Sequence, residues 1–191
     1  WKQKAVFLSS INNGKSWSSP FAVADDESGR IFNWDLRCGV DKSGRICSFA
    51  WTYDSHKEKF LNIHQRISVD AGQTWTKPKD LKIADQASHP ALSKDGKIIL
   101  PWVDRFQSRS IKVRIANNLY SEFNNSSEIT IFEQTNKNSS KDNKLGKLLA
   151  DMSIWNFGLP YADVLPSGKI LVFYYAGNNK QMNLHWTRLT L

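Results

Sequence analysis

Apolar and polar residues alternate along two short stretches in the middle of the chain, residues 61–67 and 79–84. A period of two residues is typical of β-strands that bury one face. Between these stretches lies a polar segment with the residues Ser68, Asp70, Gly72 and Trp75. Asp70 can accept hydrogen bonds from its own turn, and Gly72 can take a positive φ. The pattern therefore predicts a β-hairpin that Trp75 closes by burying its ring.

The same turn pattern occurs two more times. Residues 10–17 repeat it with Asn12 at the Asp position, followed by Gly14 and Trp17. Residues 116–123 occupy the corresponding place in a later unit, in a form that has lost the Asp, the Gly and the Trp. By analogy, we expect the closing aromatic residues of these turns, Trp17, Trp75 and Phe123, to be buried.

A second repeated signature alternates with the first. Three turns contain Gly44, Gly96 and Gly168, and each is followed by an apolar run, at 46–51, 98–103 and 170–175. Runs that are nearly continuous in apolar character are expected of strands buried on both faces.

Together the two signatures define a repeating unit of about 50 residues, the size of one four-stranded propeller blade. The sequence thus predicts an all-β protein, a β-propeller of antiparallel blades, with blade portions 1–30, 31–86, 87–150 and 151–191. About three blades cannot close a ring, because propellers use about four to eight. We therefore expect the C-terminal part of a larger propeller that is incomplete at the N-terminus. Residues 135–151 are polar at first and predict a long surface loop with one helical turn at most.

The composition narrows the range of partners. The net charge is +8, but Lys and Arg are scattered singly, which favours a solvated surface and predicts no nucleic-acid partner. No apolar run is long enough for a membrane span, and the first residues show no secretion signal. No metal-ligand spacing is present. Cys38 and Cys47 would face each other across a two-residue hairpin; we expect free buried thiols ahead of a strained cross-strand bridge.

The turn at 68–75 matches the Ser-x-Asp-x-Gly-x-x-Trp pattern of the Asp-box, or BNR repeat. With the segments 34–37, 88–92, 101–105, 157–163 and 185–189, the chain resembles the sialidase-like BNR-repeat family over nearly its whole length. The resemblance implies a six-bladed propeller in which the boxes are structural turns. Catalytic members of the family are glycoside hydrolases that use an arginine triad, a Tyr-Glu nucleophile pair and an aspartic acid/base. The resemblance also implies a secreted, periplasmic or extracellular protein, a glycan or small sugar as partner, and no cofactor.

Candidate site residues follow from the repeat register, because equivalent positions on the innermost strands of a propeller converge on one channel. Arg37, His89 and Tyr161 stand seven residues before the three turn glycines, and Asp35 and Asp163 lie two residues from Arg37 and Tyr161. By strand alternation, each Asp should share the face of its neighbour.

A second candidate group, Trp51, Asp104, Arg105 and Tyr174, follows the buried strands, where loops commonly carry ligand contacts. The candidate catalytic residues are thus Asp35, Asp104, Asp163 and Tyr161. The candidate substrate-binding residues are Arg37, His89, Arg105, Trp51 and Tyr174. Aromatic rings would stack on a sugar, an Arg would fork a carboxylate, and carboxyl groups would act as acid or base.

Each of these residues also has a purely structural interpretation: His89 as a strand start before Pro90, Asp104 with Arg105 as a surface pair, Arg37 as the partner of Asp35. The Arg-Ile-Pro motif of the family is absent, and no Glu stands in an obvious position beside Tyr161. Two hypotheses remain: a sialidase-like glycoside hydrolase, and a non-catalytic propeller that binds glycan or protein.

Overall fold

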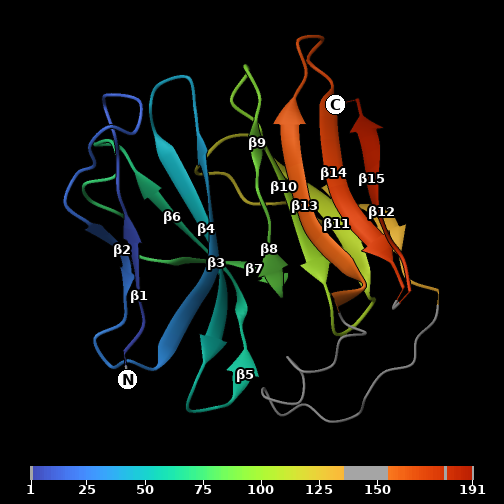
Figure 1. Cartoon of the computed structure of the whole chain (residues 1–191), viewed down its shortest axis with the longest axis horizontal. Helices are drawn as coiled ribbons and strands as arrows, with labels where there is room; N and C mark the ends of the chain where they lie inside the picture. The colour runs from blue at the N-terminus through green and yellow to red at the C-terminus, as the bar shows by residue number, and fades with distance from the viewer. Residues whose placement is uncertain (1, 136–154, 179, 191) are drawn as a thin grey trace.

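The predicted hairpins form four antiparallel sheets in a computed structural model, which describes residues 2–135, 155–178 and 180–190 (Figure 1). The first sheet pairs β1 (Lys4–Phe7) with β2 (Phe21–Asp25). The second has the order β3-β4-β6-β7, with the short β5 paired to β4. Its strands are β3 (Ile31–Val40), β4 (Ile46–Asp54), β5 (Lys59–Phe60), β6 (Asn62–Ser68) and β7 (Lys79–Ala84).

The third sheet starts with a strand broken into two pieces, β8 and β9, which both pair with β10. It comprises β8 (Gln86–Ala87), β9 (Ala91–Leu92), β10 (Ile98–Asp104), β11 (Ser110–Ala116) and β12 (Ile129–Glu133). The fourth consists of β13 (Phe157–Val164), β14 (Ile170–Gly177) and β15 (Met182–Leu189). The described residues contain no α-helix, and their one complete helical element is a 3₁₀ turn at Asn125–Ser127, so the prediction of an all-β propeller fold is confirmed.

Apolar side chains join the sheets face to face. Phe49 and Ile63 of the second sheet pack in one buried cluster with Leu100 and Trp102 of the third. Further clusters join the third sheet to the fourth, as where Ile99 packs with Val172. Because the sheets stack in this way, the first strands of the second, third and fourth sheets lie side by side. An isolated parallel bridge joins His89 to Tyr161. The strands β3, β8/β9 and β13 are therefore the neighbouring inner strands of successive blades.

Each inner strand carries one extra residue at the same level. Between the pairs Trp34–Trp51 and Arg37–Phe49, β3 advances by three residues and β4 by two. The strand β13 does the same against β14, and the broken strand β8/β9 also carries one extra residue against β10. These are β-bulges, which locally redirect side chains. Asp35 and Leu159 lie in them with φ values of 46° and 44°, in the left-handed region.

The turns at 68–75 and 10–17 share one hydrogen-bond pattern. The Oγ of Ser68 accepts from the Gly72 amide at 2.8 Å, and Oδ1 of Asp70 accepts from the Thr74 amide at 2.9 Å. In the first turn, Ser10 and Asn12 accept the corresponding bonds at 2.8 and 2.9 Å. Gly72 has a φ of 87°, and a Cβ there would lie 2.5 Å from Phe7, so this position requires glycine.

The closing aromatic residues differ in burial. Phe123 is 5% exposed and packs against Phe49, and Trp75 is half-buried with its ring edge-on to Phe7. Trp17 is 62% exposed, so the prediction that it is a core residue is wrong. In the described part of the chain no earlier sheet lies beside this turn to cover the ring, as the first sheet covers Trp75.

The cysteines are free thiols and do not face each other. The turn after β3 has a three-residue loop, closed by the Asp41 amide on the Arg45 carbonyl, so Cys38 pairs with Ser48 and Cys47 with Gly39. The expectation of opposed cysteines was wrong by one residue of register. Burial raises the pKa of Cys38 to about 11 and that of Cys47 to about 12.

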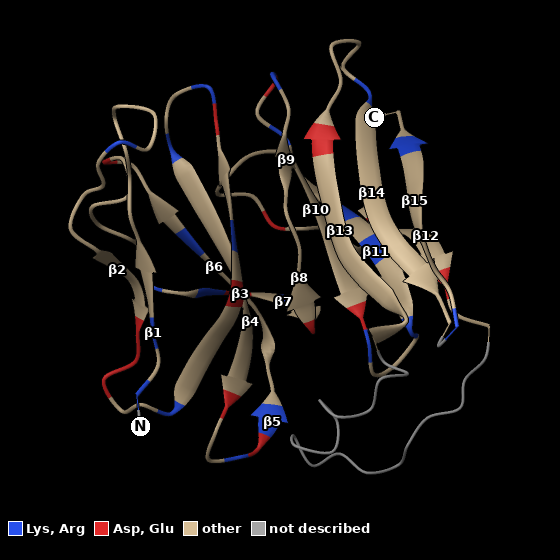
Figure 2. Ribbon diagram, viewed as in Figure 1, with Lys and Arg blue, Asp and Glu red and all other residues tan. Residues whose placement is uncertain are grey.

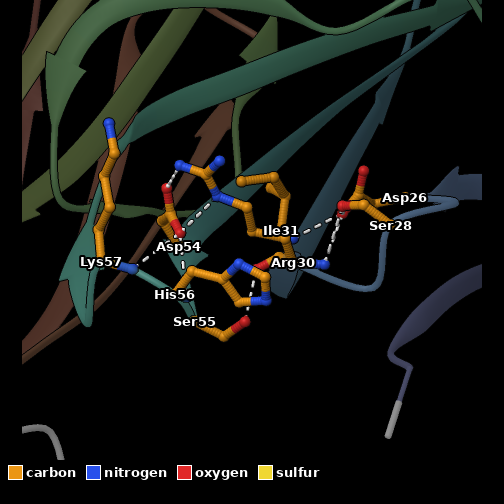
Figure 3. Close-up of polar contacts among 8 residues, drawn as sticks. All are labelled: Asp26, Ser28, Arg30, Ile31, Asp54, Ser55, His56 and Lys57. Carbon is orange, nitrogen blue, oxygen red and sulfur yellow. Dashed lines mark hydrogen bonds and ion pairs between the residues drawn. The ribbon is translucent and has the colours of Figure 1, made fainter.

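Charged side chains tie strand ends to turns. Arg30, just before β3, donates to both oxygens of Asp54 at 2.8 and 2.5 Å, and Asp54 also accepts the amides of His56 and Lys57 (Figure 3). These bonds, above all the one from Arg30, hold the pKa of Asp54 well below its usual range. Elsewhere Lys and Arg are spread over turns and strands of several sheets, with Asp and Glu between them (Figure 2).

The predicted loop at 135–151 and the boundary between the portions 87–150 and 151–191 fall almost wholly outside the described residues. Among the residues that the structure does describe, no helix has the length and apolar character needed to cross a membrane.

Candidate functional site

Arg37 and Tyr161 are the first paired residues past the bulges in β3 and β13, and His89 lies in the break between β8 and β9, bridged to Tyr161. Together with Ser88, Leu159 and Pro160 they line a pocket of about 230 Å³. Three sheets therefore contribute to one pocket, as the register predicted. The side chain of Arg37 is 36% exposed and Tyr161 is 48% exposed, so both can reach a ligand.

His89 and Tyr161 form the wall of this pocket. Their rings are stacked, with centroids 3.9 Å apart and an angle of 10° between the planes. Burial and the nearby Arg37 lower the pKa of His89, while Asp163 acts in the opposite direction. The imidazole is therefore neutral near pH 7, and it limits the orientations that the phenol ring of Tyr161 can take.

Asp163 lies on the same face of β13 as Tyr161. Both are exposed, and Ala162 between them is 1% exposed, so strand alternation holds here. Its Oδ1 accepts the amide of Val164 at 2.7 Å. A carboxylate thus accompanies the phenol at the channel face.

Asp35 is the second carboxylate near the pocket. Because of the bulge, simple alternation does not relate it to Arg37, yet Oδ1 of Asp35 lies 3.8 Å from Nη2 of Arg37. Its Oδ2 accepts a hydrogen bond from Nε2 of Gln86 at 2.5 Å. Gln86 comes from the neighbouring inner strand and fixes the position of this carboxylate.

Gln86 is held in turn by Arg105. Nε and Nη2 of Arg105 donate to Oε1 of Gln86 at 2.8 and 2.6 Å, and Nη1 donates to the Phe157 carbonyl at 2.9 Å. The guanidinium also lies 4.3 Å from the ring centroid of Trp155. A polar chain therefore runs from Asp35 through Gln86 and Arg105 to β13, across all three inner strands.

This arrangement places Arg105 behind the pocket. It is 1% exposed, and burial lowers its pKa, which Tyr175 and Asp85 counteract. Gly158 has a φ of 149°, and a Cβ there would lie 2.5 Å from Nη2 of Arg105. The arginine predicted as a substrate contact thus links three blades, and it needs a glycine beside it.

Three other predicted site residues are also turned inward. Trp51 is 2% exposed and stacks on Phe60 at 4.4 Å, and Tyr174 is 7% exposed and packs against Phe132 and His185. Asp104 accepts bonds from the amides of Gln107 and Ser108 and from the Ser108 hydroxyl, which shapes the turn after β10. None of the three lines the pocket of Arg37, His89 and Tyr161.

The pocket therefore presents a guanidinium, a neutral imidazole and a phenol. Two carboxylates lie near it without lining it: Asp35, 3.8 Å from Arg37, and Asp163, on the face of β13 that carries Tyr161. A guanidinium can bind a carboxylate through two parallel hydrogen bonds, and carboxyl groups can exchange protons with a leaving group or water. No Glu is among the described residues that line the pocket, and the described residues contain no group of His, Cys, Asp and Glu arranged to hold a metal ion. Gln86 and Gly158 could not be identified from the sequence, because their roles depend on the distant Arg105.

Comparison with known proteins places the fold. No family model and no curated protein sequence matches the chain. Among solved structures, a protein of unknown function from Dyadobacter fermentans aligns with 95% of the chain at a TM-score of 0.67 and 19% identity. An intramolecular trans-sialidase from Ruminococcus gnavus aligns with 97% of the chain at a TM-score of 0.56 and 14% identity. An α-L-arabinofuranosidase from Fusarium graminearum aligns with 98% of the chain at a TM-score of 0.61 and 14% identity.

The chain spans 44%, 38% and 55% of these three structures. At such identities the likeness concerns the fold alone: the chain has the architecture of part of a β-propeller of the kind found in sialidases and arabinofuranosidases.

Proposed function

We propose that this chain is part of a carbohydrate-active, sialidase-like propeller, a glycoside hydrolase that acts on terminal sugars, acidic ones included, when the propeller is complete. The observation that carries the proposal is the convergence of Arg37, His89 and Tyr161 from three inner strands on one pocket. A packed propeller core needs no such polar set at equivalent positions.

In the proposed site Tyr161 is the nucleophile. Its phenolic proton passes to one of the two carboxylates, Asp35 or Asp163, and its oxygen attacks the anomeric carbon while the other, as a carboxylic acid, protonates the departing glycosidic oxygen. The bond from sugar to leaving group breaks as the bond from sugar to tyrosine forms. The carboxylate that gave up its proton then takes one from water, whose oxygen attacks the anomeric carbon, and the departing tyrosine oxygen takes its proton back from the other carboxyl, which releases the sugar and restores Tyr161. Arg37 binds a carboxylate or hydroxyl of the sugar, and His89 holds the tyrosine ring by stacking.

One further observation supports the proposed sialidase-like character. The turns at 10–17 and 68–75 share their hydrogen bonds, as a structural Asp-box would require. The same resemblance leads us to propose a secreted, periplasmic or extracellular location. The alternative, a non-catalytic propeller that binds glycan or protein, would use the same pocket without turnover.

The outer face of the fourth sheet supports a larger propeller. Trp186 is 62% exposed, Leu184 74% and Phe173 37%, and the pairing of β14 with β15 puts them on one face. Adjacent apolar side chains at such exposure usually mark an interaction surface. We propose that another blade of an upstream propeller half covers this face; a ring completed by identical chains would instead give an oligomer in solution.

The experiment is hydrolysis of a panel of sialosides and arabinofuranosides by the full-length protein and by Arg37→Ala, which removes the guanidinium from the pocket. Turnover by the parent and its loss in the variant is the expected result. Turnover that Arg37→Ala leaves unchanged would contradict the site. Absence of turnover, with glycan binding that Arg37→Ala weakens, would favour the non-catalytic alternative.

A further inference from the structure

A second and larger cleft lies between the second and third sheets. It measures about 500 Å³ and is formed by β5, the start of β6, the end of β7 and the turn after β10. None of the described residues that line it lines the pocket of Arg37, His89 and Tyr161. The volume is within the range of small-molecule sites.

One wall of the cleft is a stack of aromatic rings. Phe60 lies between Trp51, at 4.4 Å, and Phe106, at 5.3 Å, with angles of 13° and 24° between the planes. Trp51 is buried in the second sheet, whereas Phe106 is 37% exposed on the turn after β10. The stack thus fixes Phe106 as a platform on which the apolar face of a ligand ring can lie.

Asp85 supplies a polar group with spare hydrogen-bonding capacity. It is 4% exposed and has a φ of 75°, and its Oδ2 accepts a hydrogen bond from the amide of Arg105 at 2.5 Å. Oδ1 is buried and has no hydrogen-bond partner among the described residues. A buried oxygen left unpaired is costly, and Asp85 lines the cleft, so a ligand hydroxyl that reaches Oδ1 by a small shift of the side chains over it would satisfy it.

The charge of the lining favours a neutral ligand. Glu58 and Asp104 line the cleft with Lys59 as the one described basic residue of the lining, and this excess of negative charge disfavours an anionic sugar. A cation is disfavoured for another reason. Asp104 is already occupied by the bonds of its own turn, and burial raises the pKa of Asp85 to about 8, so that carboxyl is mostly protonated near pH 7.

We propose that this cleft is a second carbohydrate site, which binds a neutral glycosyl unit through a hydroxyl hydrogen-bonded to Asp85 and a ring face stacked on Phe106. The proposal does not depend on hydrolysis at the first pocket. It assigns to the two pockets different ligands, an Arg-lined pocket for an acidic or terminal sugar and an acid-lined cleft for a neutral one.

The test is saturation-transfer NMR on the full-length protein, with methyl β-D-galactopyranoside and methyl α-L-arabinofuranoside as neutral probes. N-acetylneuraminic acid and glucosamine serve as the anionic and cationic probes. The variants are Phe106→Ala and Phe106→Leu, of which the second keeps apolar packing on Phe60 but removes the aromatic face. Tyr120→Ala is the matched control, since Tyr120 is an exposed aromatic residue, 57% exposed, that does not line the cleft.

We expect at least one neutral probe to bind at millimolar concentration, to bind about 5-fold or more weakly in both Phe106 variants, and to bind unchanged in Tyr120→Ala. Asp85→Ala should also weaken binding, because it removes the carboxyl group that bonds the ligand hydroxyl. Neutral probes that do not bind, or that bind the Phe106 variants as well as the parent, would overturn the proposal. So would preferential binding of glucosamine. A failure of the function proposed for the first pocket would be seen in a separate experiment, as turnover that Tyr161→Phe does not change.

Discussion

The imidazole of His89 lies parallel to the phenol ring of Tyr161, with 3.9 Å between ring centroids. The two residues stand on neighbouring inner strands, and their backbones form a parallel bridge. The stack therefore joins two blades at the point where the candidate site lies, and it couples the orientation of the tyrosine to the packing of the sheets.

Replacing His89 should separate positioning from chemistry. His89→Ala removes the ring that stacks on Tyr161, and we expect kcat to fall about 10-fold or more with little change in KM, because misplacement of a reacting group affects the transition state most. His89→Phe restores a stacking ring and should recover most of kcat. Equal losses in both variants would show that the nitrogen atoms of His89, and not its ring, matter.

Gly158 should be among the least replaceable glycines in the chain. Gly158→Ala puts a Cβ 2.5 Å from the buried Arg105 at a φ of 149°, so the guanidinium must leave Gln86 or the strand must shift. We expect a loss of about 2 to 4 kcal/mol in the free energy of unfolding, measured by urea denaturation. Gly168→Ala is the control: its φ is 81°, but no atom lies within 4 Å, and it should cost about 1 kcal/mol. Equal costs would contradict the role of Arg105.

Acid should weaken the turn at 68–75 but not the turn at 10–17. Hydrogen bonds from Thr74 and Ser68 lower the pKa of Asp70 to about 2, below the value near 3.9 of an unfolded chain. The stabilisation is therefore fully present above about pH 4 and is lost as the pH falls towards 2. Asp70→Asn, which copies Asn12, should reduce the fall in the urea midpoint between pH 4.5 and 2.5. An unchanged fall would exclude Asp70 as a source of acid sensitivity.

The two thiols should resist modification while the protein is folded. Burial raises the pKa of Cys38 to about 11 and that of Cys47 to about 12, so very little thiolate exists at pH 8. A disulfide reagent should label both slowly in buffer and rapidly in denaturant. Rapid labelling of Cys38 in buffer would show that β3 opens readily.

The strands and turns could be predicted because their signals are local. Alternation at 61–67 and the glycine turns required no knowledge of distant residues. The placement of Arg37, His89 and Tyr161 on one pocket could also be predicted, since β3 and β13 pair without a further shift between these positions and their turns. Counting from the turn glycines therefore gave the right register.

What the sequence could not show depends on contacts between distant segments. Arg105 resembled a surface loop residue, because its partners Gln86 and Phe157 lie on other strands. Trp17 and Trp75 have the same local pattern, yet Phe7 lies against Trp75 alone of the two. No glycine in the sequence indicates the bulge that places Asp35 in the left-handed region.

The most direct test of the proposed site is kcat/KM of the full-length Tyr161→Phe variant on the glycoside panel. The substitution removes one hydroxyl and keeps the ring on His89, so stability should be unchanged. We predict that the parent hydrolyses a sialoside or an arabinofuranoside and that the variant loses at least about 100-fold in kcat/KM. A variant as active as the parent would contradict the assignment of Tyr161 as nucleophile.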